Sequence, residues 1–122
     1  NLFSDSTDLL KIAPSTATLG TRDSAEVGII FYNLESETLE FQAKTIKVEN
    51  GVDLDCKFVD TESDTSETFT LRSGANAKMK LRVDTTKETI LGHGGCKIEI
   101  TSLTSEDTGY QLKKTLSIEI EP

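Results

Sequence analysis

Strict alternation of apolar and polar residues along several short segments constrains this sequence more than any other feature. Successive side chains of a β-strand point to opposite faces, so alternation with a period of two marks a strand with one buried face. The clearest case is residues 77–83, where every second residue is apolar and basic residues stand between. Residues 25–31 and 96–100 follow the same pattern. No segment shows the 3.6-residue period of an amphipathic helix over several turns.

Turn-forming residues separate these segments at short intervals, most clearly at Asn50-Gly51 and Ser73-Gly74. Short strands divided in this way are typical of a β-sandwich. We therefore predict an all-β, antiparallel β-sandwich of about seven to nine strands. The 122 residues suffice for one domain. We assign residues 8–122 to that domain and residues 1–7 to an N-terminal tail or linker.

One expected strand changes its parity. Its apolar residues stand at odd positions from 39 to 43 and at even positions from 46 to 48. An extra residue in one strand of a pair produces such a change, so we predict a β-bulge near Lys44 and Thr45.

The balance of charge excludes several classes of partner. Lysine and arginine number 13 against 21 aspartate and glutamate residues, which leaves a net charge of −8. Such a surface lacks the cations that neutralise phosphates, so we expect no nucleic-acid partner and no electrostatic docking on a membrane. No stretch approaches the roughly 20 apolar residues of a spanning helix, so we expect no membrane insertion. Because the sequence begins at Asn1 without a signal-peptide pattern, we interpret it as a fragment or a processed chain.

The order of the expected strands forms a longer pattern. An Ile-x-Pro segment precedes a strand ending in asparagine, a Leu-x-Phe strand and a short strand with phenylalanine. A Thr-Leu-x-x-Gly turn, a long alternating strand, an x-Ile-x-Ile strand after glycine and a last alternating strand follow. The segments are LLKIAP, AEVGIIFYN, LEFQAK, CKFV, TFTLRSGANAKMKLRVD, GGCKIEI and LKKTLSIEI. This pattern, over residues 10–121, resembles the immunoglobulin-like modules of bacterial and archaeal surface proteins. The nearest are the cell-adhesion-related bacterial domain and the sandwich module attached to alpha-galactosidases.

The resemblance implies an immunoglobulin-like fold and a non-enzymatic role as a spacer, stalk or adhesion module. It also implies an extracellular or cell-surface location, with neighbouring domains of the same protein or other surface proteins as partners. Cys96 departs from the pattern, because such modules often carry an aromatic residue early in the penultimate strand. Related patterns occur in periplasmic chaperone-like sandwiches and in cytosolic sperm-protein-type domains.

The two cysteines, Cys56 and Cys96, both fall on the apolar parity of their expected strands. Two buried cysteines can serve as small hydrophobic side chains. They can also form a disulfide between the sheets, which would contribute about 4 kcal/mol by chain entropy. The even count, the shared parity and the resemblance favour the disulfide, which would place the protein outside the reducing cytosol. Two cysteines and one histidine at these spacings match no zinc pattern.

No set of residues in the sequence supports catalysis, so we expect a protein that is not an enzyme. His93 is the sole histidine and stands in a glycine-rich segment, 92–95, that we interpret as a loop. A general base needs a nucleophile and an orienting acid nearby, and no Gly-x-Ser-x-Gly elbow is present. We expect these glycines to allow positive φ angles in a tight turn.

The acidic segment 60–67 is the best candidate for a ligand site. Hard cations such as Ca²⁺ prefer six to eight oxygen ligands. The candidate ligands are Asp60, Glu62, Asp64 and Glu67. The segment lacks the glycine and the spacing of an EF-hand, so a solvated loop without a cofactor is the default interpretation. A glycan would need exposed aromatic faces, for which only Tyr32 and Tyr110 are candidates.

These observations favour a non-catalytic immunoglobulin-like module of a larger secreted or cell-surface protein, acting as a spacer, adhesion or assembly domain. Two alternatives stay open. One is an accessory module that binds a glycan or calcium through its loops. The other is a cytosolic sandwich that binds its partner by strand addition.

Overall fold

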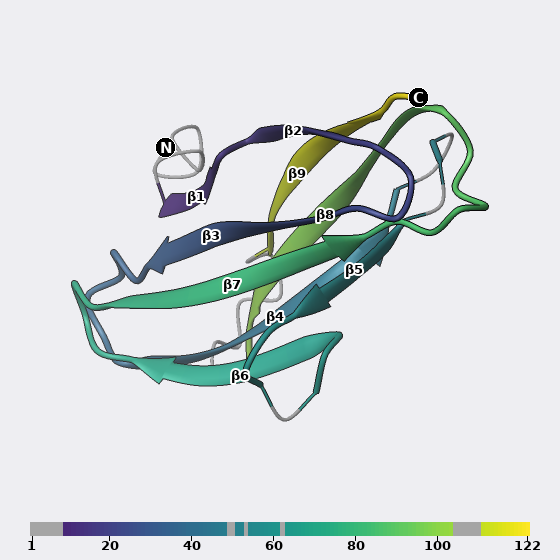
Figure 1. Cartoon of the computed structure of the whole chain (residues 1–122). Coiled ribbons are helices and arrows are strands. Elements are labelled where there is room, and N and C mark those ends of the chain that lie inside the picture. The colour runs from purple at the N-terminus through teal and green to yellow at the C-terminus, as the bar shows by residue number, and fades with distance from the viewer. Residues whose placement is uncertain (1–8, 49–50, 53, 62, 104–110) are drawn as a thin grey trace.

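The computed structural model describes residues 9–48, 51–52, 54–61, 63–103 and 111–122. These residues form nine strands (Figure 1). In chain order they are β1 (Leu10–Ala13), β2 (Thr16–Leu19), β3 (Ser24–Tyr32), β4 (Leu39–Lys47), β5 (Asp55–Phe58), β6 (Ser66–Leu71), β7 (Asn76–Asp84), β8 (Gly92–Ser102) and β9 (Gln111–Ile120). The predicted tail at 1–7 lies outside the described residues, so that assignment stays a prediction.

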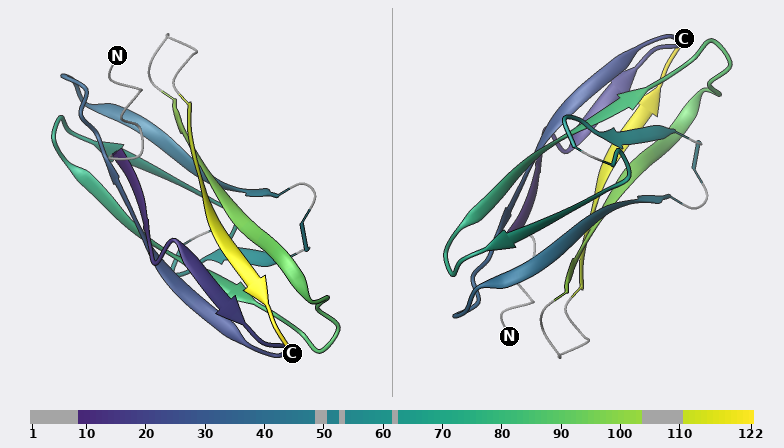
Figure 2. Two further views of the ribbon diagram at one scale, coloured as in Figure 1. Left: turned by 90° about the horizontal axis from the view of Figure 1, so that it is seen from above. Right: turned by 90° about the horizontal axis from the view of Figure 1, so that it is seen from below.

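The strands form two sheets that pack face to face (Figures 1 and 2). One has the order β1-β3-β7-β5, and the other has the order β2-β9-β8-β4-β6. The predicted all-β sandwich is confirmed. Its strands are not all antiparallel, because β2 and β9 pair in parallel from Thr16–Ser117 to Leu19–Ile120. The chain leaves the four-stranded sheet after β1 and joins the five-stranded sheet as β2 without reversing its direction.

The alternation in the sequence places one face of each long strand in the core. β3 and β7 pair along their whole length, and their odd-numbered residues face the other sheet. Phe31 of β3 meets Phe41 of β4 and Phe69 of β6, with ring centroids 4.8 and 6.1 Å apart. Phe31 and Phe41 are fully buried. This aromatic cluster therefore fixes the two sheets against each other, since such rings bury large apolar areas at defined angles.

Asn33 is a fully buried polar side chain at the end of β3. Its Nδ2 donates to the carbonyl oxygens of Glu37 and Leu71, both at 3.0 Å. Its Oδ1 accepts from the backbone N–H of Glu35 at 3.0 Å. The side chain therefore joins the β3–β4 connection to the end of β6.

A second polar contact closes the turn before β3. The carboxylate of Asp23 accepts from the backbone N–H groups of Gly20 and Ser24 at 3.1 and 2.8 Å. These two hydrogen bonds lower the pKa of Asp23, because they stabilise its charged form. Thr85 Oγ1 accepts from the Asp23 N–H at 2.7 Å and donates to the Gly20 carbonyl at 2.7 Å. The turn is thereby fixed to the end of β7.

β1 begins at one end of the sandwich and β9 finishes at the other. Leu10, at the start of β1, lies beside Phe31 near the end of β3. Ile120, at the end of β9, lies beside Leu19, which precedes the turn into the start of β3. The two places lie toward opposite ends of the sandwich (Figure 2). Since β3 runs along the sheet between them, its rise per residue puts about 25 Å between them.

The parity change in β4 has another cause than a bulge. β4 pairs with β8 in unbroken register from Phe41–Ser102 to Lys47–Cys96, so the bulge predicted near Lys44 and Thr45 is wrong. The even-numbered apolar residues lie on the outer face, where Ile46 is beside Lys97 and Val48 packs against glycine backbone. A Cβ built on Gly95 would lie 3.6 Å from Val48 Cγ2.

Candidate functional site

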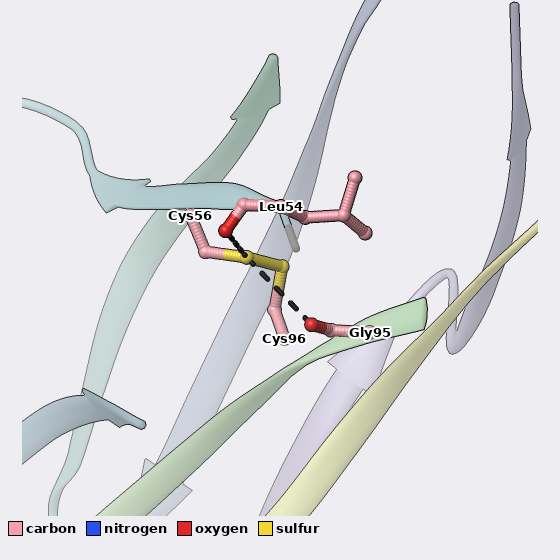
Figure 3. The surroundings of a disulfide bond; sticks show 4 residues. All are labelled: Leu54, Cys56, Gly95 and Cys96. Carbon is pink, nitrogen blue, oxygen red and sulfur yellow. Dashed lines mark hydrogen bonds between the residues drawn. A yellow bond between two sulfur atoms is a disulfide. The ribbon is translucent and has the colours of Figure 1, made fainter. Parts of the chain in front are cut away.

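Cys56 on β5 and Cys96 on β8 form a disulfide that joins the two sheets (Figure 3). The Cα atoms lie 6.0 Å apart, and the two residues are separated by 40 positions in the sequence. Cys96 is buried and Cys56 is half-buried. The predicted disulfide is confirmed, and it crosslinks the sandwich where the short strand β5 pairs with only part of β7.

The sulfur atoms are held among backbone carbonyl groups. Cys56 Sγ lies 3.9 Å from the Leu54 oxygen and 4.0 Å from the Gly95 oxygen, the contacts dashed in Figure 3. A disulfide sulfur carries no proton, so we interpret both as packing contacts. Neither cysteine offers a thiolate for nucleophilic chemistry while the bond is intact.

The glycine-rich segment 92–95 belongs to strand β8, so its interpretation as a loop is wrong. Gly92 has a φ of +137°, as expected for a positive-φ glycine. At positions 94 and 95 glycine is required because a side chain would not fit, and not because of the backbone φ angle. A Cβ on Gly94 would lie 2.7 Å from the Val52 oxygen, and one on Gly95 would lie 2.6 Å from the Leu116 oxygen. Neighbouring backbone approaches β8 too closely there for any side chain.

His93 lies on this strand with an exposed side chain. Its backbone oxygen accepts from the Val52 N–H at 2.9 Å. Among the described residues, none forms a hydrogen bond or ion pair with its imidazole ring, so nothing there orients it as a base. Of the two candidate aromatic platforms, Tyr32 is half-buried and Tyr110 lies outside the described residues.

The acidic segment forms the wall of a small polar hollow. Asp60 and Glu67 line about 500 Å³ together with the side chains of Thr61, Ser63, Ser66 and Thr68. Asp64 does not line it, and Glu62 lies outside the described residues. Over the described part of the chain, no three His, Cys, Asp or Glu side chains are grouped to hold a metal. Calcium binding by Asp60, Glu62, Asp64 and Glu67 stays a prediction.

A second hollow, which the sequence analysis missed, lies on the outer face of the four-stranded sheet. This outer groove encloses about 590 Å³. Its floor includes Ala13, Gly28 and Ile30, and Val59 also lines it. Its charged lining residues are Lys11, Lys78, Lys80, Asp60 and Glu67. The sequence did contain a signal for this groove. Gly28 and Ile30 stand at even positions of β3, which the alternation assigns to the solvent-facing side of the strand.

The register of the sheet explains how the groove is assembled. Ile30 lies between Lys11 on β1 and Lys78 on β7, and Gly28 lies between Ala13 and Lys80. Two rows of side chains thus cross the strands, each with a β3 residue in the middle.

The lysines of the groove differ from the other cations on the same sheet. Lys57 pairs with Asp55 at 3.3 Å, and Arg82 pairs with Asp84 at 3.0 Å. Lys11, Lys78 and Lys80 are exposed and form no ion pair with any described residue. Their charges are therefore available to a ligand.

The described residues contain no helix with the length and hydrophobicity needed to span a membrane. No family model matches the chain, and no curated protein matches its sequence.

Several solved structures have a similar fold. A family 123 glycoside hydrolase from Clostridium perfringens is similar with a TM-score of 0.61 at 13% identity, over 87% of this chain and 22% of the hydrolase. An alpha-2-macroglobulin from Escherichia coli has a TM-score of 0.61 at 16% identity, over 86% of this chain and 9% of that protein. The ASH/PapD-like domain of human CEP192 has a TM-score of 0.52 at 14% identity, over 93% of this chain and 85% of that one.

At these identities the likeness shows the fold alone, an immunoglobulin-like and PapD-like β-sandwich. The immunoglobulin-like fold expected from the sequence is confirmed at that level. This chain spans about a fifth, 22%, of the hydrolase it is similar to.

Proposed function

We propose that this chain is a non-catalytic module of a larger secreted or cell-surface protein, in which it separates neighbouring domains and resists tension. The observation that carries the proposal is the placement of its first and last strands. β1 begins and β9 ends at opposite ends of the sandwich, so domains attached there would be held about 25 Å apart. The similar folds that form small parts of larger proteins support a modular role.

The parallel pair β2–β9 would carry the load. A pull on the two ends acts along the strands and draws β2 and β9 in opposite directions. The hydrogen bonds at the two ends of this pair run across the pull, from Ser117 N to Ser15 O at 3.1 Å and from Glu121 N to Leu19 O at 2.9 Å. Bonds arranged in this way must break together, so this edge would set the force at which the module unfolds.

Single-molecule stretching of a tandem repeat of the chain tests this role. The Ala17→Pro variant removes a backbone N–H from β2 and should lower the unfolding force, since proline cannot donate to the ladder. The matched control is Glu67→Pro, which removes a ladder N–H from β6 at the opposite edge of the same sheet and should leave the force nearly unchanged. Equal forces for wild type and Ala17→Pro, or an equal drop in both variants, would overturn the load-bearing role.

The disulfide adds a second readout to the same experiment. While it is intact, the segment between Cys56 and Cys96 cannot extend. Reduction should therefore lengthen each unfolding step by about 130 Å, which is 40 residues at roughly 3.3 Å each.

A location outside the reducing cytosol is part of the proposal, and the inter-sheet disulfide supports it. We expect protein isolated without reductant and unfolded in the presence of an alkylating agent to show no modified thiol by intact mass. Two thiols should appear only after reduction. Two modified thiols in the unreduced sample would instead favour the cytosolic alternative, a sandwich that binds its partner by strand addition.

A further inference from the structure

We propose that the outer groove of the four-stranded sheet binds an extended acidic peptide of a partner protein, with an apolar side chain on the groove floor. The proposal goes beyond the spacer role and does not depend on it, because the groove lies on a sheet face and not at the load-bearing edge. Its volume of about 590 Å³ falls within the range of protein ligand sites.

Gly28 is the first observation that points to a ligand. It lies in the middle of the nine-residue strand β3, where glycine weakens a strand relative to a residue with a side chain. Its φ is not positive, and a Cβ there would meet only the Ala13 oxygen at 3.8 Å, an ordinary contact. Nothing in the described chain requires glycine at this position. The missing side chain leaves open space at the floor of the groove, which a ligand can fill.

Charge is the second observation. The chain has a net charge of −8, yet three lysines without ion pairs among the described residues stand around this apolar floor. Ile30 lies directly between Lys11 and Lys78, so an apolar group on Ile30 has a cation on each side. Alternate side chains of an extended peptide share one face, so a ligand that matches this arrangement has a carboxylate two residues before and two residues after its apolar residue.

The opposite charges at the groove favour a peptide over a fatty acid. Asp60 and Glu67 also line the groove and supply hydrogen-bond acceptors. Backbone N–H groups of an extended peptide can donate to them, whereas an acyl chain with one carboxylate has no donor to offer. The peptide therefore satisfies both kinds of charge in the groove.

The test uses the full chain and a fluorescein-labelled heptapeptide with leucine at position 4, glutamate at positions 2 and 6 and serine elsewhere, measured by fluorescence anisotropy. We expect saturable binding with a Kd of roughly 10–100 µM, which weakens as salt is added. The Gly28→Val variant fills the floor with a good strand residue, so it should bind at least about tenfold more weakly without a fall in Tm. Lys80→Glu should weaken binding to a similar degree. Lys87→Glu, which makes the same charge change away from the groove, should bind as the wild type does.

Several outcomes would overturn the proposal. The same heptapeptide with lysine in place of both glutamates should not bind, and equal binding of the two peptides would show that charge does not select the ligand. Unchanged binding by Gly28→Val would place the peptide elsewhere on the protein. Failure of the acidic peptide to bind at 1 mM, or tighter binding of dodecanoate at the same residues, would exclude an acidic peptide as the occupant. None of these results would alter the force measurement on Ala17→Pro.

Discussion

Replacing Cys56 and Cys96 together by alanine should lower the free energy of unfolding by about 4 kcal/mol. The crosslink spans 40 residues, and closing a loop of that length lowers the conformational entropy of the unfolded chain, which raises its free energy relative to the folded state. Urea titration followed by far-ultraviolet circular dichroism measures the change. Because a small domain loses about 1–3 kcal/mol per molar urea, the midpoint should fall by about 2 M.

A reduced wild-type sample separates the crosslink from packing. It retains both cysteine side chains, so it should lose nearly as much stability as the double variant. If the reduced protein were as stable as the oxidised one while the variant unfolded, the side-chain volume of the buried Cys96 would be the cause. That result would contradict the stabilising role assigned to the crosslink.

Alternation predicted the elements that bury one complete face. β3 and β7 have their odd-numbered residues in the core, and Cys56 and Cys96 share a disulfide as their parity indicated. The period of two shows directly which side chains of a strand are buried, so these features can be predicted from the local sequence.

Features that depend on contacts between distant segments could not be predicted in this way. The parallel pairing of β2 with β9 depends on where the chain crosses between sheets. Gly94 and Gly95 looked like a loop, because only the folded chain shows how closely the backbone at Val52 and Leu116 approaches them. Ile46 and Val48 suggested a bulge, although apolar side chains on the outer face produce the same parity change.

The outer groove was missed for a related reason. Its lining comes from four strands and from the β5–β6 connection, which are brought together only by the fold. The lysines of β7 alternate with core residues and looked like an ordinary solvated face. The local signals were Gly28 and Ile30 at even positions of β3, and the meaning of the glycine depends on the open space above it.

Asn33→Ala should destabilise the protein by about 3 kcal/mol. Alanine removes three hydrogen bonds and leaves the buried Leu71 carbonyl without the amide donor. Each such bond contributes about 1 kcal/mol, and an unsatisfied buried group adds a penalty of similar size. Asn76→Ala is the matched control, because Asn76 is exposed on β7, and its unfolding free energy should change by less than about 0.5 kcal/mol.

Asn33→Asp distinguishes a hydrogen-bond network from a simple turn preference. Aspartate suits turns nearly as well as asparagine, so a turn role predicts a milder effect than that of alanine. In the network the new carboxylate would face the carbonyl oxygens of Glu37 and Leu71 without a proton to donate. Burial would raise its pKa in the folded state above the unfolded value, so the variant should be less stable than Asn33→Ala at pH 7 and should regain stability as pH falls through the folded pKa. Urea midpoints at pH 7 and pH 4.5 measure this. An aspartate variant more stable than the alanine variant at pH 7 would show that Asn33 acts through the turn rather than through its amide.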